Sequence, residues 1–115
     1  MAFDSAPRPT FPRERPGLVF FDRHELSQIL ALYGRMVAAG RWRDYALDCL
    51  NDAAVFSIFR SASETALFGI EKRPAHARRH GAWAVIAHGG LVLKRGHALA
   101  QVLSIFDRPK FSLVK

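Results

Sequence analysis

The clearest periodic pattern in the chain predicts an amphipathic helix over residues 22–39. Asp22 and Glu25 form an Asp-x-x-Glu variant of the capping box, which marks the start of a helix. Gly40 fits the position after the last turn, where glycine readily takes a left-handed conformation. Between these signals, apolar residues recur at helical spacing, at Leu26, Ile29, Leu30, Tyr33, Met36 and Val37. The pattern therefore predicts one helix with a single buried face.

The middle of the chain predicts short antiparallel strands. Residues 55–60, 65–73, 81–87 and 91–94 are rich in aliphatic, aromatic and β-branched side chains and are separated by turn signals. The separators are a turn at 61–64, a loop at 74–80 and a tight turn at 88–90. The paired glycines of this last turn supply the positive φ that a hairpin requires.

Two further segments leave alternatives open. Residues 41–50 alternate apolar and polar side chains from Tyr45 to Cys49, which suits a half-buried strand, although a short helix would also bury Trp42. The Asn-Asp turn signal at 51–52 favours a strand that leads into a hairpin. The apolar run Leu18–Phe21 fits either an edge strand or a staple that docks the start of the following helix.

The order of the elements predicts an α+β fold. A second helix is expected over Gly96–Phe106, ended by the Arg-Pro pair at 108–109, and a last strand is possible at 111–114. A helix, several antiparallel strands and a helix correspond to an antiparallel meander of four to five strands packed against two helices on one face. Residues 18–115 form this single domain, and the Pro- and Arg-rich residues 1–17 are expected to be a disordered basic tail.

Length and composition restrict the class of protein. The chain has 115 residues, half of them hydrophobic, and a mean hydropathy close to zero, which is typical of one folded domain. No apolar run approaches the roughly 18 residues of a membrane span. The first residues carry Pro and Arg where a signal peptide is apolar, so we expect a cytoplasmic protein. The single cysteine, Cys49, excludes a disulfide within the chain and fits a reducing compartment.

The net charge is the feature of the composition that says most about function. Seventeen Lys and Arg face ten Asp and Glu, so the net charge is +7, and Arg outnumbers Lys by 13 to 4. The planar guanidinium suits phosphates, carboxylates and aromatic faces, which favours a binding role. A GC-rich genome would also enrich Arg over Lys, but it explains the net charge less readily.

Two basic segments are the candidate binding sites. The loop Lys72–His80 concentrates four Lys and Arg with two histidines, and local excess charge of this kind binds phosphates. The segment Lys94–His97 enters the second predicted helix, whose free N–H groups would attract an anion. If the intervening hairpin bends back, the two segments share one edge of the sheet. A solvated loop without a ligand is the alternative for the first segment.

One aromatic residue completes the candidate site. Trp42 lies between two arginines, and exposed aromatic side chains beside basic residues stack on bases. The polyanion-binding residues predicted from the sequence are Lys72, Arg73, Arg78, Arg79, Lys94, Arg95 and Trp42.

Catalytic and metal-binding patterns are weak. No nucleophile, base and orienting group occur at a recognisable spacing, so we expect neither an enzyme nor a cofactor. His76 and His80 have the spacing of a helical metal pair, but the arginines between them would repel a dication. Aspartates flank Cys49 and raise the pKa of a thiol, which is the wrong direction for a nucleophile.

Several strings of residues resemble a known family. They are Val19-Phe20-Phe21-Asp22-Arg23, the stretch 32–40, Trp42-Arg43-Asp44-Tyr45-Ala46, Ile70-Glu71-Lys72-Arg73-Pro74 and the stretch 92–103. Together they resemble the small bacterial proteins grouped as domain of unknown function 2794. The resemblance covers nearly everything after the tail, and it implies no activity, cofactor, substrate or functional residue.

Two functions remain after these exclusions. The first is a small nucleic-acid-binding or polyanion-binding module that acts through the two basic segments. The alternative is a protein-interaction or regulatory adaptor that docks on an acidic protein surface. In that case the tail would fold on the partner and Leu18–Phe21 would add a strand to its sheet.

Overall fold

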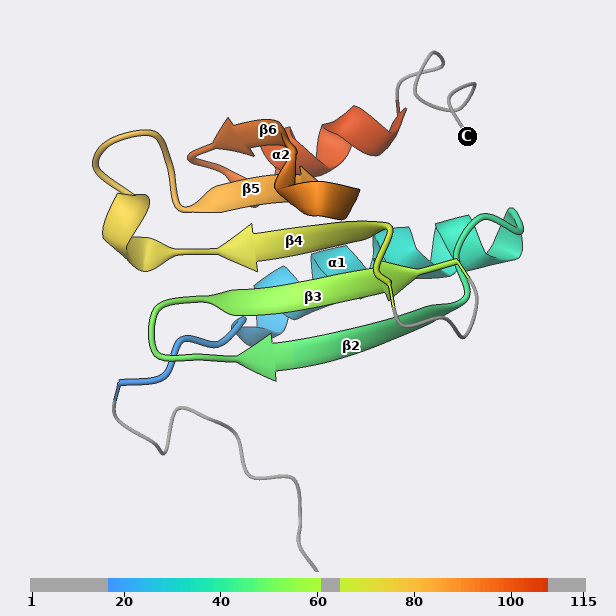
Figure 1. The fold of residues 1–115 in the computed structure, drawn as a ribbon, viewed down its shortest axis with the longest axis horizontal. Coiled ribbons are helices and arrows are strands. Elements are labelled where there is room, and N and C mark those ends of the chain that lie inside the picture. Colours follow the sequence, from blue (N-terminus) through green and yellow to red (C-terminus); the bar gives the residue numbers. More distant parts are fainter. Residues whose placement is uncertain (1–16, 61–64, 108–115) are drawn as a thin grey trace, which may run out of the picture.

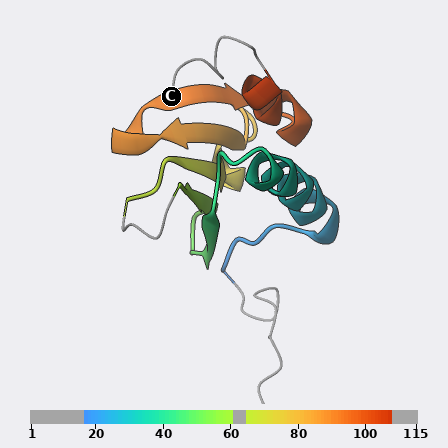
Figure 2. The ribbon, with the colours of Figure 1, turned by 90° about the vertical axis from the view of Figure 1, so that its right-hand side faces the viewer.

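One antiparallel sheet with helices on one side makes up the part of the chain that the structure describes. The computed structural model describes residues 17–60 and 65–107, in which five antiparallel strands form one sheet in the order β2-β3-β4-β5-β6. Both helices lie on the same side of this sheet (Figures 1 and 2). The strands are β2 (Asp44–Cys49), β3 (Ala54–Phe59), β4 (Phe68–Lys72), β5 (Trp83–Ala87) and β6 (Val92–Gly96). The helices are α1 (Arg23–Ala38) and α2 (Leu99–Leu103), and α2 continues as the 3-10 turn Ser104–Asp107. The predicted α+β fold is confirmed.

The core lies between the sheet and the helices. Phe56 of β3 pairs with Ile70 of β4, which pairs with Val85 of β5, and all three side chains are fully buried. Ile29 of α1 and Val102 of α2 belong to the same buried cluster. The opposite face of the sheet carries the alternate residues of each strand and has no helix on it within the described ranges (Figure 2).

The start of α1 is fixed by the predicted capping box. The Asp22 side chain accepts a hydrogen bond from the Glu25 N–H, and the Glu25 side chain accepts one from the Asp22 N–H, each at 2.8 Å. Gly40, after the cap, has a φ of +77° and fulfils the role expected of it. The helix has 16 residues, and none in the described ranges combines the length and the apolar character of a membrane span.

The structure resolves the ambiguous segments. Residues 44–49 form β2, so the strand interpretation of 41–50 is confirmed. The expectation that this strand is half-buried is wrong, because Tyr45 and Leu47 are exposed at the edge of the sheet. Leu18–Phe21 forms no strand: Phe21 is buried and stacks on Trp83 with ring centroids 6.0 Å apart. The run therefore docks the start of α1 instead of forming an edge strand. The expected tail apart from Gly17, the turn at 61–64 and the strand at 111–114 lie outside the described residues.

The expected start of the second helix is wrong. Residues 94–96 pair with β5 as part of β6, and α2 begins only at Leu99. Pairing with a neighbouring strand satisfies the backbone of these residues, so the strand continues through them. Lys94 and Arg95 therefore do not lie at a helix N-terminus, and that part of the predicted anion site is withdrawn.

Candidate polyanion-binding site

Lys72 points inward instead of toward a ligand. Its Nζ lies 2.7 Å from Oε1 of Glu25 and donates to the carbonyl of Phe20 at 3.0 Å. The same ammonium lies 5.8 Å from the ring centroid of Trp83, and the side chain is only 20% exposed. Lys72 therefore ties the start of α1 to the sheet.

This role predicts the behaviour of a Lys72→Met variant. The change removes the ammonium and leaves the largely buried Glu25 carboxylate without its ion-pair partner. We expect the free energy of unfolding, measured in urea, to fall by about 2 kcal/mol. Polyanion affinity of the folded protein should stay within about twofold, since the lost charge does not face the ligand. An unchanged stability with a large loss of binding would contradict the assignment.

Arg73 is held by two carboxylates. Its Nε donates to Oε1 of Glu71 at 3.0 Å, and its Nη1 lies 3.1 Å from Oδ2 of Asp52. The hydrogen bond to Glu71 is the main reason that the pKa of Arg73 is raised. With both acids beside it, this guanidinium adds little net positive potential at the surface.

The expectation that Trp42 is exposed is wrong. Its side chain is 3% exposed and packs edge-on against Phe106 with ring centroids 5.1 Å apart. The ring centroid of Phe68 lies 6.2 Å from that of Trp42, and Phe68 also packs edge-on against Phe106. These apolar neighbours from β4 and the turn after α2 enclose the ring, so Trp42 belongs to the core and cannot stack on a base.

The register of β5 and β6 brings the two basic segments together. Trp83 pairs with Gly96 and Ala84 pairs with Arg95, so the loop before β5 lies beside the end of β6. Figure 1 shows this loop and the end of β6 at the same end of the sheet. We call the resulting group of side chains the basic corner; it consists of His76, Arg79, His80, Arg95 and His97.

The remaining predicted residues lie around this corner. Arg78 is exposed in the same loop. Lys94 pairs with Val85, whereas Arg95 pairs with Ala84, so the two neighbouring cations point to opposite faces of the sheet. Only Arg95 of this pair joins the basic corner.

The loop is held in shape by its backbone. Arg73 N–H donates to the carbonyl of Ala82 at 2.7 Å and closes the loop. Inside it, the carbonyl of His76 accepts from the N–H groups of Arg79 and Gly81, both at 3.0 Å. Preorganised cations lose less conformational freedom on binding than cations on an unstructured segment.

His80 lies among basic groups in this corner. The pKa of His80 is lowered by partial desolvation and then by Arg95, His76, Arg79 and His97, in that order. All four charged or chargeable neighbours are basic. The rings of His76 and His80 lie 4.7 Å apart, and Nδ1 of His76 is buried without a hydrogen-bond partner among the described residues. An anion beside His80 would offset the repulsion from these neighbours.

Sequence reasoning missed the histidines of this corner. His80 and His97 lie in the two basic segments but were not chosen as site residues, because their proximity depends on the β5–β6 register. The paired glycines at 89–90 were the available signal, since they fix where the hairpin turns.

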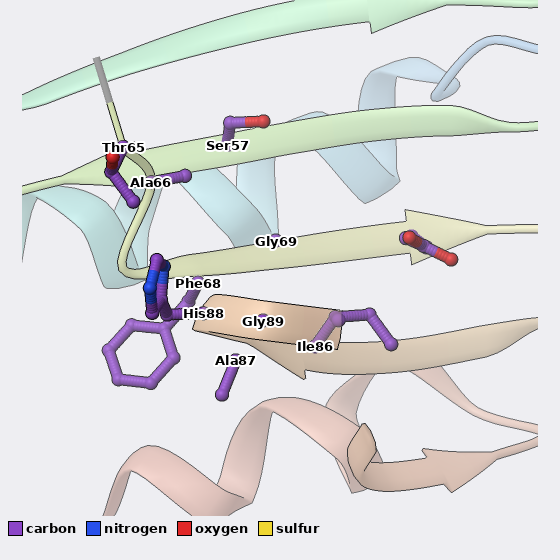
Figure 3. Close-up of a pocket in the computed structure, with 10 residues that line it drawn as sticks. Ser57, Thr65, Ala66, Phe68, Gly69, Ile86, Ala87, His88 and Gly89 are labelled. Carbon is purple, nitrogen blue, oxygen red and sulfur yellow. The ribbon is translucent and has the colours of Figure 1, made fainter. Parts of the chain in front are cut away.

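A second hollow lies on the open face of the sheet. It encloses about 380 Å³ over Gly69, whose missing side chain leaves space between its neighbours (Figure 3). Its polar lining residues are Ser57, Thr65, Glu71 and His88. The carboxylate of Glu71 is already engaged by Arg73. The expectation that the protein is not an enzyme stays a prediction.

The cysteine and the candidate metal ligands are also described by the structure. Burial and then Asp48 raise the pKa of the Cys49 thiol, which disfavours a thiolate nucleophile. Within residues 17–60 and 65–107, no three His, Cys, Asp or Glu side chains gather as a set of metal ligands.

Comparison with known proteins identifies the family. The model of the family described as "Protein of unknown function (DUF2794)" matches residues 19–103, which is most of the chain. The chain belongs to the DUF2794 family. No curated protein and no solved structure matches it. The match runs from the segment that docks α1 to the end of α2, so the DUF2794 region includes the whole sheet and the basic corner.

Proposed function

We propose that this DUF2794 domain binds polyanions, with nucleic acid as the main candidate, through the basic corner. The observation that carries this proposal is the juxtaposition of Arg79 and Arg95 from segments 16 positions apart, with only basic groups acting on His80 between them. Folding has brought like charges together at an energetic cost that an anionic ligand offsets.

The corner suits phosphates better than a compact carboxylate. Arg78, Arg79 and Arg95 offer several guanidinium forks along one end of the sheet, and guanidinium binds phosphate oxygens in pairs. Cations spread in this way neutralise several phosphates at once and release their counterions. The corner contains no Phe, Tyr or Trp side chain, and its contacts are suited to the phosphate backbone, so we expect little sequence preference.

The test is fluorescence anisotropy of labelled single- and double-stranded DNA and RNA oligomers across a salt series. We expect binding that weakens steeply as salt rises, with a slope equivalent to about two to four phosphate contacts. Polyglutamate of matched length serves as a competitor and distinguishes phosphate recognition from general attraction to negative charge. No binding to any oligomer at low salt would overturn the proposal.

The histidines predict a pH dependence. His80 has a lowered pKa in the free protein, and a bound phosphate would raise it by replacing repulsion with attraction. Binding then takes up protons, so affinity should increase as the pH falls through the interval between the two values and be flat above it. Anisotropy measured from about pH 8 to pH 5.5 checks this. His80→Gln should reduce the pH dependence, whereas His88→Gln, at the other end of the sheet, should leave it unchanged; equal pH profiles in all three proteins would contradict the prediction.

A second candidate is protein interaction through the edge of the sheet. β2 has no neighbouring strand on its outer side within the described residues, and its Tyr45 and Leu47 are 46% and 43% exposed. Such an edge can accept an added strand. A partner that stays bound after nuclease treatment, and is lost with Leu47→Lys, would favour this adaptor role over polyanion binding.

A further inference from the structure

An apolar cavity lies at the opposite end of the sheet from the basic corner. It encloses about 530 Å³, within the range of roughly 300–1,000 Å³ that is usual for small-molecule sites. It opens where α1 ends, β3 ends and β6 begins. Its apolar walls are formed by Met36, Trp42, Leu67, Phe68, Leu91 and Leu93.

The inner wall of this cavity is packed against the core. Trp42 is almost fully buried and packs with Phe68 and Phe106, whose rings also contact each other. Leu93 packs against the same core cluster. The cavity is therefore a preformed part of the fold, and a ligand that enters it does not have to order these side chains.

Two arginines line the same cavity. Arg41 comes from the connection between α1 and β2, and Arg60 follows the last residue of β3. No acidic residue lines the cavity among the described residues, and no described carboxylate forms an ion pair with Arg60. An apolar chamber with guanidinium groups in its lining is complementary to a molecule with an apolar body and an anionic head.

From this combination we infer that the cavity binds an amphiphilic carboxylate, a small molecule with an aliphatic or aromatic body and one carboxylate. The apolar body occupies the space beside Trp42, and the carboxylate lies at the mouth near Arg60. A polyanion such as nucleic acid does not fit this chamber, because its charges are too many and its apolar surface too small. The cavity and the basic corner are therefore two separate sites, and the inference does not rest on polyanion binding.

Substitutions of Leu91 test ligand binding in this cavity without disturbing the core. The Leu91 side chain is 63% exposed at the cavity, so substitutions there leave the core intact. Leu91→Glu places a negative charge at the mouth, and Leu91→Gln is its neutral match. Arg60→Gln removes the proposed carboxylate partner. Arg43→Gln removes one exposed positive charge outside the cavity and is the matched control.

The experiment is isothermal titration calorimetry of the full chain with decanoate and, as the uncharged analogue, decanol. We expect one decanoate per chain, with decanol binding about tenfold more weakly, and a loss of about tenfold in Arg60→Gln but not in Arg43→Gln. Leu91→Glu should weaken decanoate binding more than Leu91→Gln does. Absence of saturable decanoate binding, equal affinity for decanol, or equal losses in the two arginine variants would overturn the inference.

Discussion

Replacing Gly81 with alanine should lower the free energy of unfolding by about 4 kcal/mol or more. Gly81 has a φ of +101°, a region that a residue with a side chain rarely adopts. A Cβ at this position would overlap the carbonyl group of Gly96 and lie 2.7 Å from the backbone nitrogen of His97. Backbone atoms of a paired strand cannot move aside without breaking the pairing.

The Gly81→Ala substitution should also disturb the basic corner. Gly81 lies where the basic loop enters β5, directly against the end of β6. Relieving the clash requires these two segments to separate, which moves Arg79 away from Arg95. We therefore expect Gly81→Ala to weaken polyanion binding as well, even at temperatures where the protein remains folded.

Urea unfolding followed by circular dichroism measures the stability effect. Gly89→Ala is the matched control, because Gly89 also has a positive φ, +85°, but a Cβ there has no neighbour within 4 Å. That variant should lose only about 1–2 kcal/mol, the conformational cost alone. If Gly81→Ala is no less stable than Gly89→Ala, the close packing of the loop against β6 is wrong.

Reversing the charges of Arg79 and Arg95 together should reduce nucleic-acid affinity by roughly 100-fold or more near physiological salt. Each glutamate removes one phosphate contact and adds repulsion at the same point. The slope of the logarithm of affinity against the logarithm of salt should fall by about two, one for each lost contact. Because Arg79 is exposed and Arg95 lies on the open face of the sheet, the domain should remain folded.

The matched control is the double variant Arg43→Glu with Arg60→Glu. It changes the net charge by the same amount, but both arginines are exposed at the other end of the sheet. We expect a loss of less than about tenfold from the weaker long-range attraction, which salt screens. Equal losses in the two double variants would show that net charge alone, and not the basic corner, drives binding.

Local signals in the sequence predicted most of the fold. The capping box at Asp22 and Glu25 marked the start of α1 because both hydrogen bonds form between residues three apart. The alternation in 45–49 and the turn signal after it favoured β2 over a short helix, because a two-residue period suits a strand. The start of α2 was misplaced because Arg95 and Gly96 are held by β5, a contact that local sequence does not encode.

The candidate site was predicted only in part, because it too depends on contacts that local sequence does not encode. The basic segments were visible as charge, but partners distant in sequence decide which charges are available. Lys72 is neutralised by Glu25, 47 residues away, and Arg73 by Asp52, 21 residues away. Trp42 is covered by Phe106, from the other end of the chain. The pairing of β5 with β6 then selects Arg79 and Arg95 as neighbours.

The most direct test of the central claim is a ¹⁵N chemical-shift titration of the full chain with an unlabelled single-stranded oligonucleotide. Binding at the basic corner predicts that the largest shifts fall in residues 76–81 and 94–98, with small changes at Arg43 and Arg60. Largest shifts along β2, or around the cavity at the far end of the sheet, would contradict the basic corner as the binding site.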